Sequence, residues 1–441
     1  MKTALWYTLR GVCRLQRTQE RSMAGEVTIR ASLARPYLAA ATTPQVAYML
    51  IEVTPGQVMT QVRAPVNVCF VIDRSGSMKG EKIDRVRRAT IRAIEMLDAQ
   101  NVVSVVIFDH RTEVLIPATH VTNPAELIDR VNRVRDSGGT RIAPAVEAGL
   151  REIDKGPPHL VRRLILLTDG QTENKSDCLR RAEDAGRRSV PITALGVGKD
   201  WNEDLLIEMA NRSGGTADYI DRPEKIVDYF QSTIQRAQAT AVQNANLTLR
   251  LVQGVLPRAV WQVYPLITNL GYRPISDRDV SVSLGELETG SGRTLLVEAL
   301  VEPRPAGEYR IAQAEVSYDV PLLNRYGEKS RADIMLTFTT DAGLIAQVNA
   351  NVMNIVEKVS AFKLQTRALQ DLAAGDIAGA TQKLQSAVTR LLNQGEVELA
   401  QTMQREIQHL QQTGKLSSEG QKTIKFGVQK TVRLSDIKKE E

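Results

Sequence analysis

Three oxygen-bearing side chains stand at alternate positions of one short loop. Asp73, Ser75 and Ser77 follow the apolar run 66–72, which the sequence predicts to be a buried strand. In an α/β domain, ligands bind where such strands end. One carboxylate and two hydroxyls suit a hard divalent cation such as Mg²⁺, whereas zinc prefers nitrogen and sulfur ligands. The loop is therefore a candidate site for Mg²⁺, with Mn²⁺ or Ca²⁺ as alternatives.

Apolar strands and amphipathic helices alternate around this loop, over residues 66–239. Several strands are almost wholly apolar, as in 103–108 and 164–167, which indicates burial on both faces of a mostly parallel sheet. We predict a doubly wound α/β domain. Its strands are expected at 66–72, 102–108, 113–116, 162–168, 191–196 and 216–220, and its helices at 79–98, 124–135, 142–154, 175–188, 202–212 and 224–239.

Short β-rich segments flank the α/β domain on both sides. Residues 25–65 and 240–340 carry alternating strands separated by turn residues, at the spacing of a sandwich. The N-terminal strands have too little core to fold alone. We therefore predict one β-sandwich built from both flanks, with the α/β domain inserted in it. Residues 341–415, rich in Ala, Gln, Leu and Val, predict a C-terminal α-helical hairpin of two or three helices, and 416–441 read as a polar tail.

The composition argues against several classes of protein. The net charge is +6, but residues 1–22 hold five basic residues against one acidic residue, so most of the excess lies there. Aromatic residues make up 4% of the chain, and no basic stripe with interleaved aromatics is present, which disfavours nucleic-acid binding. No run of 18 apolar residues exists, so we expect no transmembrane segment. Residues 1–24 are interpreted as an N-terminal extension before the folded protein.

The cysteines and histidines form no metal-binding spacing. Three cysteines are present, an odd number, and Cys69 lies inside an apolar strand, which favours a reducing, cytoplasmic compartment. Trp201 and Trp261 are interpreted as core or rim residues. The four histidines are scattered along the chain, at His110, His120, His159 and His409.

Residues 66–239 resemble a von Willebrand factor A (vWA) domain. The order of strands and loops matches, and Phe108-Asp109 and Gly196-Val197-Gly198 are similar to motifs of this family. The resemblance is most specific at the metal-ion-dependent adhesion site of the family, whose five positions are all filled. It implies these metal ligands: Asp73, Ser75, Ser77, Thr140 and Asp169.

The chemistry of these five residues agrees with the resemblance. The serine hydroxyls can ligate Mg²⁺ directly, and Thr140 can ligate it from a neighbouring loop, while Asp73 and Asp169 supply negative charge directly or through water. Neutral ligands leave the ion electrophilic, with a position open to a carboxylate. The resemblance thus implies a non-enzymatic bacterial scaffold or adaptor that binds the Asp or Glu of a protein partner.

Each of these residues also has an ordinary structural alternative. Ser77 could cap the helix predicted at 79–98, and Thr140 could cap the helix predicted at 142–154. Asp169 could form an Asx turn. The coincidence of all five residues at strand ends favours the metal site.

Known enzyme motifs fit this loop poorly. An aspartyl phosphotransferase would place a second Asp where Ser75 stands, and Arg74-Ser75-Gly76 does not match a hydrolase elbow. The run 196–200 mimics a P-loop but lacks its first Gly and its Ser or Thr. Two alternatives remain: a subunit of an AAA+ ATPase system of the MoxR or chelatase type, and a metal-dependent hydrolase that uses the same ion.

The basic tail contains two threonines of interest, Thr423 and Thr431. Sandwich-flanked bacterial vWA proteins, which the chain resembles, often end in such a tail. Phosphorylation there would create a ligand for a phosphothreonine-reading module. The alternative is an added edge strand or an unstructured end.

Overall fold

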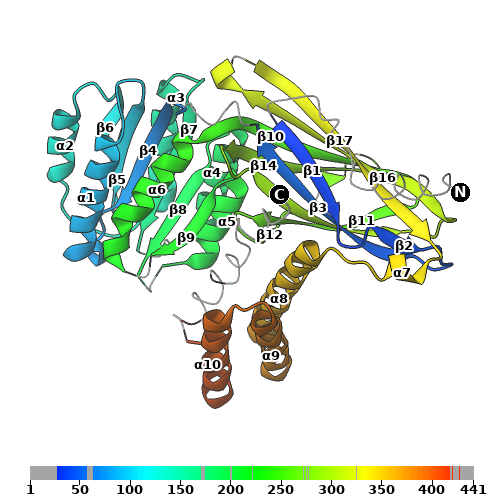
Figure 1. Ribbon diagram of the computed structural model, residues 1–441. Helices are drawn as coiled ribbons and strands as arrows, with labels where there is room; N and C mark the ends of the chain where they lie inside the picture. Colours follow the sequence, from blue (N-terminus) through cyan, green and yellow to red (C-terminus); the bar gives the residue numbers. More distant parts are fainter. Residues whose placement is uncertain are drawn as a thin grey trace, which may run out of the picture.

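A six-stranded sheet forms the core of the α/β part of the chain (Figure 1). The computed structural model describes residues 27–56, 63–169, 174–198, 201–220, 222–271, 273–274, 276, 278–323, 325–417, 420 and 427. The sheet is parallel except for its edge strand β6, which runs antiparallel to β5. Its strands lie in the order β6 (Thr112–His120), β5 (Val102–Phe108), β4 (Val66–Asp73), β7 (Val161–Thr168), β8 (Ile192–Val197) and β9 (Thr216–Ile220).

Helices cover both faces of this sheet, because its central strands are apolar on both faces. On one face, the stacked rings of Phe70 and Phe230, with centroids 5.3 Å apart, join the sheet to helix α6. The predicted mostly parallel, doubly wound domain is confirmed. One face packs against α1 (Glu81–Glu95), α2 (Pro124–Asn132) and α6 (Ile226–Gln238), and the other against α3 (Ile142–Lys155), α4 (Lys175–Arg187) and α5 (Glu203–Ser213).

Two further sheets form the β-sandwich, and strands from both flanks of the α/β part build it. Strand β3 pairs with β15 from Gln45↔Val301 to Arg293↔Val53, so the N-terminal flank closes against the segment that follows the insertion. One sheet has the order β1 (Val27–Leu33), β3 (Gln45–Pro55), β15 (Arg293–Val301), β11 (Val255–Tyr264) and β12 (Thr268–Asn269). The other has the order β13 (Arg273–Pro274), β14 (Asp279–Glu288), β10 (Thr240–Leu251), β16 (Gly307–Val320), β17 (Arg325–Thr339) and β2 (Tyr37–Ala39).

The two chain crossings between sandwich and α/β part lie side by side. The Ala64 amide, just before β4, donates to the Gln238 carbonyl at the end of α6, with an N···O distance of 2.8 Å. Entry and exit of the inserted domain are therefore adjacent, at the edge of the sheet where β4 begins. The opposite side of the sheet is its carboxyl edge, formed by the carboxyl ends of the parallel strands. There β4 ends at Asp73, far from these crossings.

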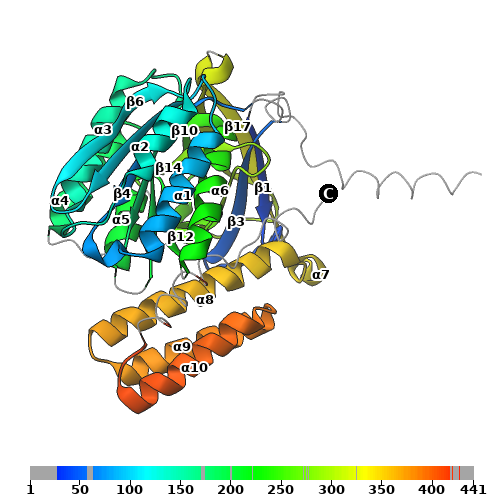
Figure 2. The same cartoon turned by 90° about the vertical axis from the view of Figure 1, so that its left-hand side faces the viewer.

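Three long helices follow the short helix α7 (Ala342–Ile345) and lie below the sandwich in both views (Figures 1 and 2). The first packs its apolar side chains on the sandwich, where Trp261 meets Phe362 edge-to-face at 6.1 Å. Turns at Gly375 and Gly395, both with positive φ, separate the helices. The three helices are α8 (Ala350–Ala373), α9 (Ile377–Asn393) and α10 (Val397–Thr413).

Trp201 and Trp261 are buried, which confirms their packing roles. No helix of the described part of the chain is both long and apolar enough to cross a membrane. The predicted N-terminal extension, and Thr423 and Thr431 of the tail, lie outside the described residues.

We expect Phe230→Ala to lower the free energy of unfolding by about 3–5 kcal/mol, because it leaves a cavity against Phe70 in a site that is otherwise closed. Urea titration followed by circular dichroism measures this loss. Gln235→Ala is the control, since Gln235 is exposed on the same helix and its truncation should change stability by less than about 0.5 kcal/mol. Equal losses in the two variants would contradict the assignment of α6 to the core.

Candidate metal site

Asp73 ends strand β4 and is fully buried. Its Oδ1 accepts a hydrogen bond from the Ser75 amide at 2.8 Å, and its Oδ2 accepts one from Thr168 Oγ1 at 2.5 Å. Burial raises the pKa of the Asp73 carboxyl to about 6, although hydrogen bonds from Ser75 and Thr168 act in the opposite direction. The structure thus holds a carboxylate at a strand end in a position where its charge lacks water.

Three of the other predicted residues form a connected chain of oxygen atoms. The hydroxyls of Ser75 and Ser77 lie 3.1 Å apart, and Ser77 Oγ donates to Asp169 Oδ1 at 2.7 Å. Asp169 follows β7, the strand next to β4, so the two strand ends bring the side chains together. Ser75 and Asp169 are buried, whereas Ser77 is exposed.

Thr140 is held beside this group by the main chain of its loop. The Gly76 amide donates to the Gly138 carbonyl at 2.9 Å, and the Ser137 amide donates to the Arg74 carbonyl at 2.6 Å. These bonds tie the loop 137–140 to the loop after β4. Among the described residues, no hydrogen bond joins the Thr140 side chain to the other four predicted ligands.

The alternative roles as helix caps are wrong for both hydroxyl residues. Helix α1 begins at Glu81 after Gly80, a left-handed residue, and Ser77 turns to Asp169 instead. Helix α3 has Arg141 at its N-cap position, with no side-chain cap. The hydroxyls of Ser77 and Thr140 are therefore not used to satisfy helix ends.

Lys82 and Thr168 belong to the site, although the sequence analysis missed them. Lys82 Nζ pairs with Asp169 Oδ2 and donates to the Ser77 carbonyl at 3.3 Å. A Cβ atom at Gly198, in the loop after β8, would lie 3.6 Å from Lys82 Nζ, so this glycine loop borders the site. The only signal in the sequence is the proximity of Lys82 to Ser77, and nothing local aims it at Asp169.

Buried Asp109 supports the loops from the other side. Its Oδ2 accepts a hydrogen bond from Arg74 Nε at 3.0 Å, and its main-chain carbonyl accepts one from the Arg141 amide at 2.9 Å. It therefore connects the loop after β4 to the segment that carries Thr140. The predicted family motif Phe108-Asp109 has a positioning role here.

The donor set fits a hard dication. It consists of two carboxylates and three hydroxyls, the oxygen ligands that Mg²⁺ prefers. Lys82 pairs with Asp169, whereas Asp73 has no ion pair among the described residues. The site therefore keeps one excess negative charge in a buried setting, which favours a cation.

Comparison with known proteins agrees with this geometry. Residues 67–232 match the profile of the von Willebrand factor type A domain. The chain contains a vWA domain. Residues 350–434 match the Sll0103-like C-terminal alpha-helical domain, so the chain also carries this second module.

Relatives of two kinds share the vWA domain. An uncharacterized protein, sll0103, from the bacterium Synechocystis sp. is 29% identical over 330 residues, which cover 74% of this chain and 78% of that protein. This relative supports the predicted bacterial origin. Inter alpha-trypsin inhibitor heavy chain 4 from Mus musculus is 32% identical over 165 residues, but these cover only 34% of this chain and 17% of the relative.

Solved structures share the whole architecture. A von Willebrand factor type A protein from Catenulispora acidiphila has a TM-score of 0.77 at 21% identity, and the match covers 94% of this chain and 99% of that one. The ArnB paralog VWA2 from Sulfolobus acidocaldarius has a TM-score of 0.57 at 16% identity, with coverage of 92% and 98%. At these identities the likeness establishes the fold: vWA domain, additional sheets and C-terminal helices.

Gly138 should be essential to the loop geometry, because it has a φ of +67° and a Cβ there would lie 2.3 Å from His110 Nδ1. We expect Gly138→Ala to cost about 1–3 kcal/mol of stability, measured by urea unfolding. Gly139→Ala is a matched control, since a Cβ at Gly139 has no atom within 4 Å and should change stability by less than about 0.5 kcal/mol. Similar values for the two variants would show that the loop is not fixed as described.

Proposed function

We propose that this protein is a non-enzymatic module that captures an acidic side chain of a protein partner through a divalent cation, most suitably Mg²⁺. vWA domains generally mediate protein–protein interaction. The oxygen cluster of this chain is the observation that supports binding through a cation. Asp73, Ser75, Ser77 and Asp169 meet at one edge of the sheet, with the Thr140 loop bonded beside them.

The proposed roles follow from charge and exposure. Ser75, Ser77 and Thr140 would offer neutral hydroxyl ligands, while Asp73 and Asp169 would supply negative charge, directly or through water. When bound, the cation supplies a Lewis-acidic position that a carboxylate can take. Ser77 is exposed and Thr140 half-buried, so this side of the cluster is open to a partner.

The surface beside Thr140 suits an acidic partner. A hollow of about 300 Å³ adjoins this residue, and the charged groups that line it are three arginines and two acids. The balance is one positive charge in favour of an incoming carboxylate. The charged lining residues are Arg141, Arg180, Arg181, Glu147 and Asp177.

The metal site lies far from the junction of the vWA domain with the sandwich. This position supports binding of a separate protein partner rather than a role at the junction. Strand β4 has eight residues, so Asp73 lies roughly 25 Å from the crossings that join the domain to the sandwich. The sandwich therefore leaves this edge free. We further propose a cytoplasmic location, which is supported by Cys69 and Cys178, both buried and free of disulfide.

Asp73→Asn tests whether the cluster holds a metal. We expect Mg²⁺ at 100 times its Kd to stabilise the wild-type protein by about 2.7 kcal/mol and to leave Asp73→Asn nearly unchanged, as measured by thermal unfolding with and without EDTA. In EDTA the variant should be at least as stable as wild type, because it removes a buried charge. Asp129→Asn, an exposed carboxylate on α2, should keep the Mg²⁺ response. A full response in Asp73→Asn would refute the site.

Capture of a partner is tested by affinity purification with and without EDTA. Partners that bind through the cation should be lost in EDTA and lost with Asp73→Ala, and they should remain with Asp129→Ala. Recovery of the same partners by Asp73→Ala protein would refute capture through the metal. Turnover of phosphoester or ester substrates in Mg²⁺, abolished by Asp73→Ala, would instead establish a hydrolase.

A further inference from the structure

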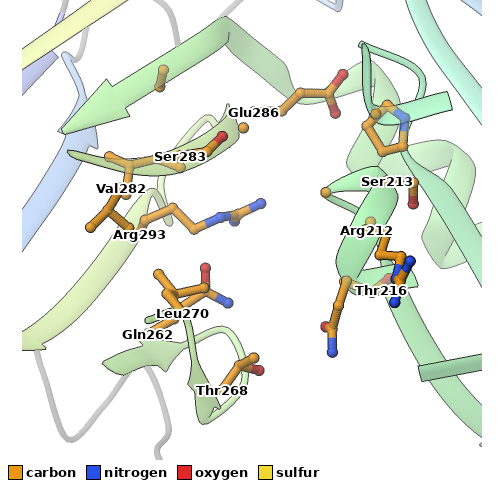
Figure 3. A pocket seen from close by; sticks show the side chains of 18 of the residues that line it. Arg212, Ser213, Thr216, Gln262, Thr268, Leu270, Val282, Ser283, Glu286 and Arg293 are labelled. Carbon is orange, nitrogen blue, oxygen red and sulfur yellow. The ribbon is translucent and has the colours of Figure 1, made fainter. Parts of the chain in front are cut away.

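A cavity of about 700 Å³ separates the vWA domain from the β-sandwich (Figure 3). The segment 213–217, which joins α5 to β9, lines it from the vWA side, and 281–286 of β14 line it from the sandwich. Pro191, just before β8, also lines it. The cavity therefore lies at the amino edge of the parallel sheet, opposite the metal site. Its volume is in the range of small-molecule sites, which often lie between domains.

Arg293 is buried at this cavity without an acidic partner. It begins β15 and is only 9% exposed, and Figure 3 shows its guanidinium directed from the sandwich into the space between the two parts. Its hydrogen bond is a long one, from Nη1 to the Gly292 carbonyl at 3.3 Å. Within the described residues, no carboxylate lies within ion-pair distance of this guanidinium.

The acids nearest to Arg293 are already paired with other arginines. Glu286 pairs with Arg163, and both side chains are largely buried. Glu288 pairs with Arg236 at 3.0 Å. A third acid of this region, Asp218, acts electrostatically on Arg236, and Arg293 is the arginine that has no ion pair among the described residues. Burial lowers the pKa of Arg293, but an arginine stays protonated at neutral pH.

A buried charge without a partner raises the free energy of the folded protein. An anion that pairs with this charge lowers that free energy, which favours binding. The planar guanidinium has donors in a fork that matches the two oxygens of a carboxylate or phosphate. Other polar groups line the same space from both sides, with Thr216 from the vWA domain and Gln262 and Ser283 from the sandwich.

We propose that this cavity binds a small organic anion, with a carboxylate or phosphate group on Arg293 and its remaining polar atoms against Thr216, Gln262 and Ser283. Because the lining comes from both parts of the chain, the anion would bridge the vWA domain and the sandwich. This site uses none of the residues of the metal site.

Isothermal titration calorimetry on the full chain in EDTA tests the proposal independently of the metal. The probes are succinate and glucose 6-phosphate, which distinguish a carboxylate from a phosphate site, with glucose and equal ionic strength of NaCl as controls. We expect saturable binding of at least one anion and none of glucose. Arg293→Met should weaken that binding at least tenfold, and Arg293→Lys, which keeps the charge but loses the fork, should weaken it less.

Arg310→Met is the matched control, since Arg310 is an exposed arginine of the sandwich that pairs with Asp333. It should bind the anion as wild type does. Without ligand, the unfolding temperature of Arg293→Met should equal or exceed that of wild type, because the variant removes an uncompensated buried charge. The proposal would be overturned if neither anion bound saturably, or if Arg293→Met bound the anion as tightly as wild type does. A lower unfolding temperature of ligand-free Arg293→Met than of wild type would also overturn it.

Discussion

Strand β4 is the constraint on which the rest of the structure depends. All eight of its residues are buried, and it pairs in parallel with β5 on one side and β7 on the other. A strand enclosed in this way has one register that matches both neighbours and both helix layers. The register places Asp73 beside Phe108 and Ile72 beside Leu167, so the loops after all three strands emerge at one edge. The candidate metal site is a consequence of that alignment.

The two edges of the same sheet have opposite surroundings. The amino edge receives both chain crossings and faces the sandwich, and there buried Arg293 has no ion pair among the described residues. The carboxyl edge lies at the far end of β4 from these crossings, and there Asp169 pairs with Lys82 while buried Asp73 has no ion pair among the described residues. The insertion of the vWA domain explains this difference between the two edges. Its first and last residues both join the sandwich at the amino edge, so the carboxyl edge is left open. The loops that carry the oxygen ligands can then vary without disturbing the junction.

Long apolar runs made the fold predictable from sequence. The strand predicted at 102–108 has the same bounds in the structure, and the helix predicted at 142–154 ends one residue later. The site was partly predictable, because Asp73, Ser75 and Ser77 lie in one loop and the family resemblance adds Thr140 and Asp169. Lys82 was missed because its partner Asp169 is 87 positions away, and the cap hypotheses failed because tertiary contacts use the hydroxyl of Ser77 elsewhere. The excess charge of Arg293 depends on pairings between domains, which no local pattern reports.

Each candidate site contains a buried charge without an ion pair in the described part of the chain, which is negative at Asp73 and positive at Arg293. A stable fold pairs its buried charges, since an unpaired one costs more than most single interactions contribute. Asp73 and Asp169 together exceed the charge of Lys82, and Arg293 has no ion pair among the described residues. Sequences violate such pairing mainly where function requires it. A cation at one edge and an anion at the other would complete the balance, and because different residues hold each, the two ligands can be removed and measured separately.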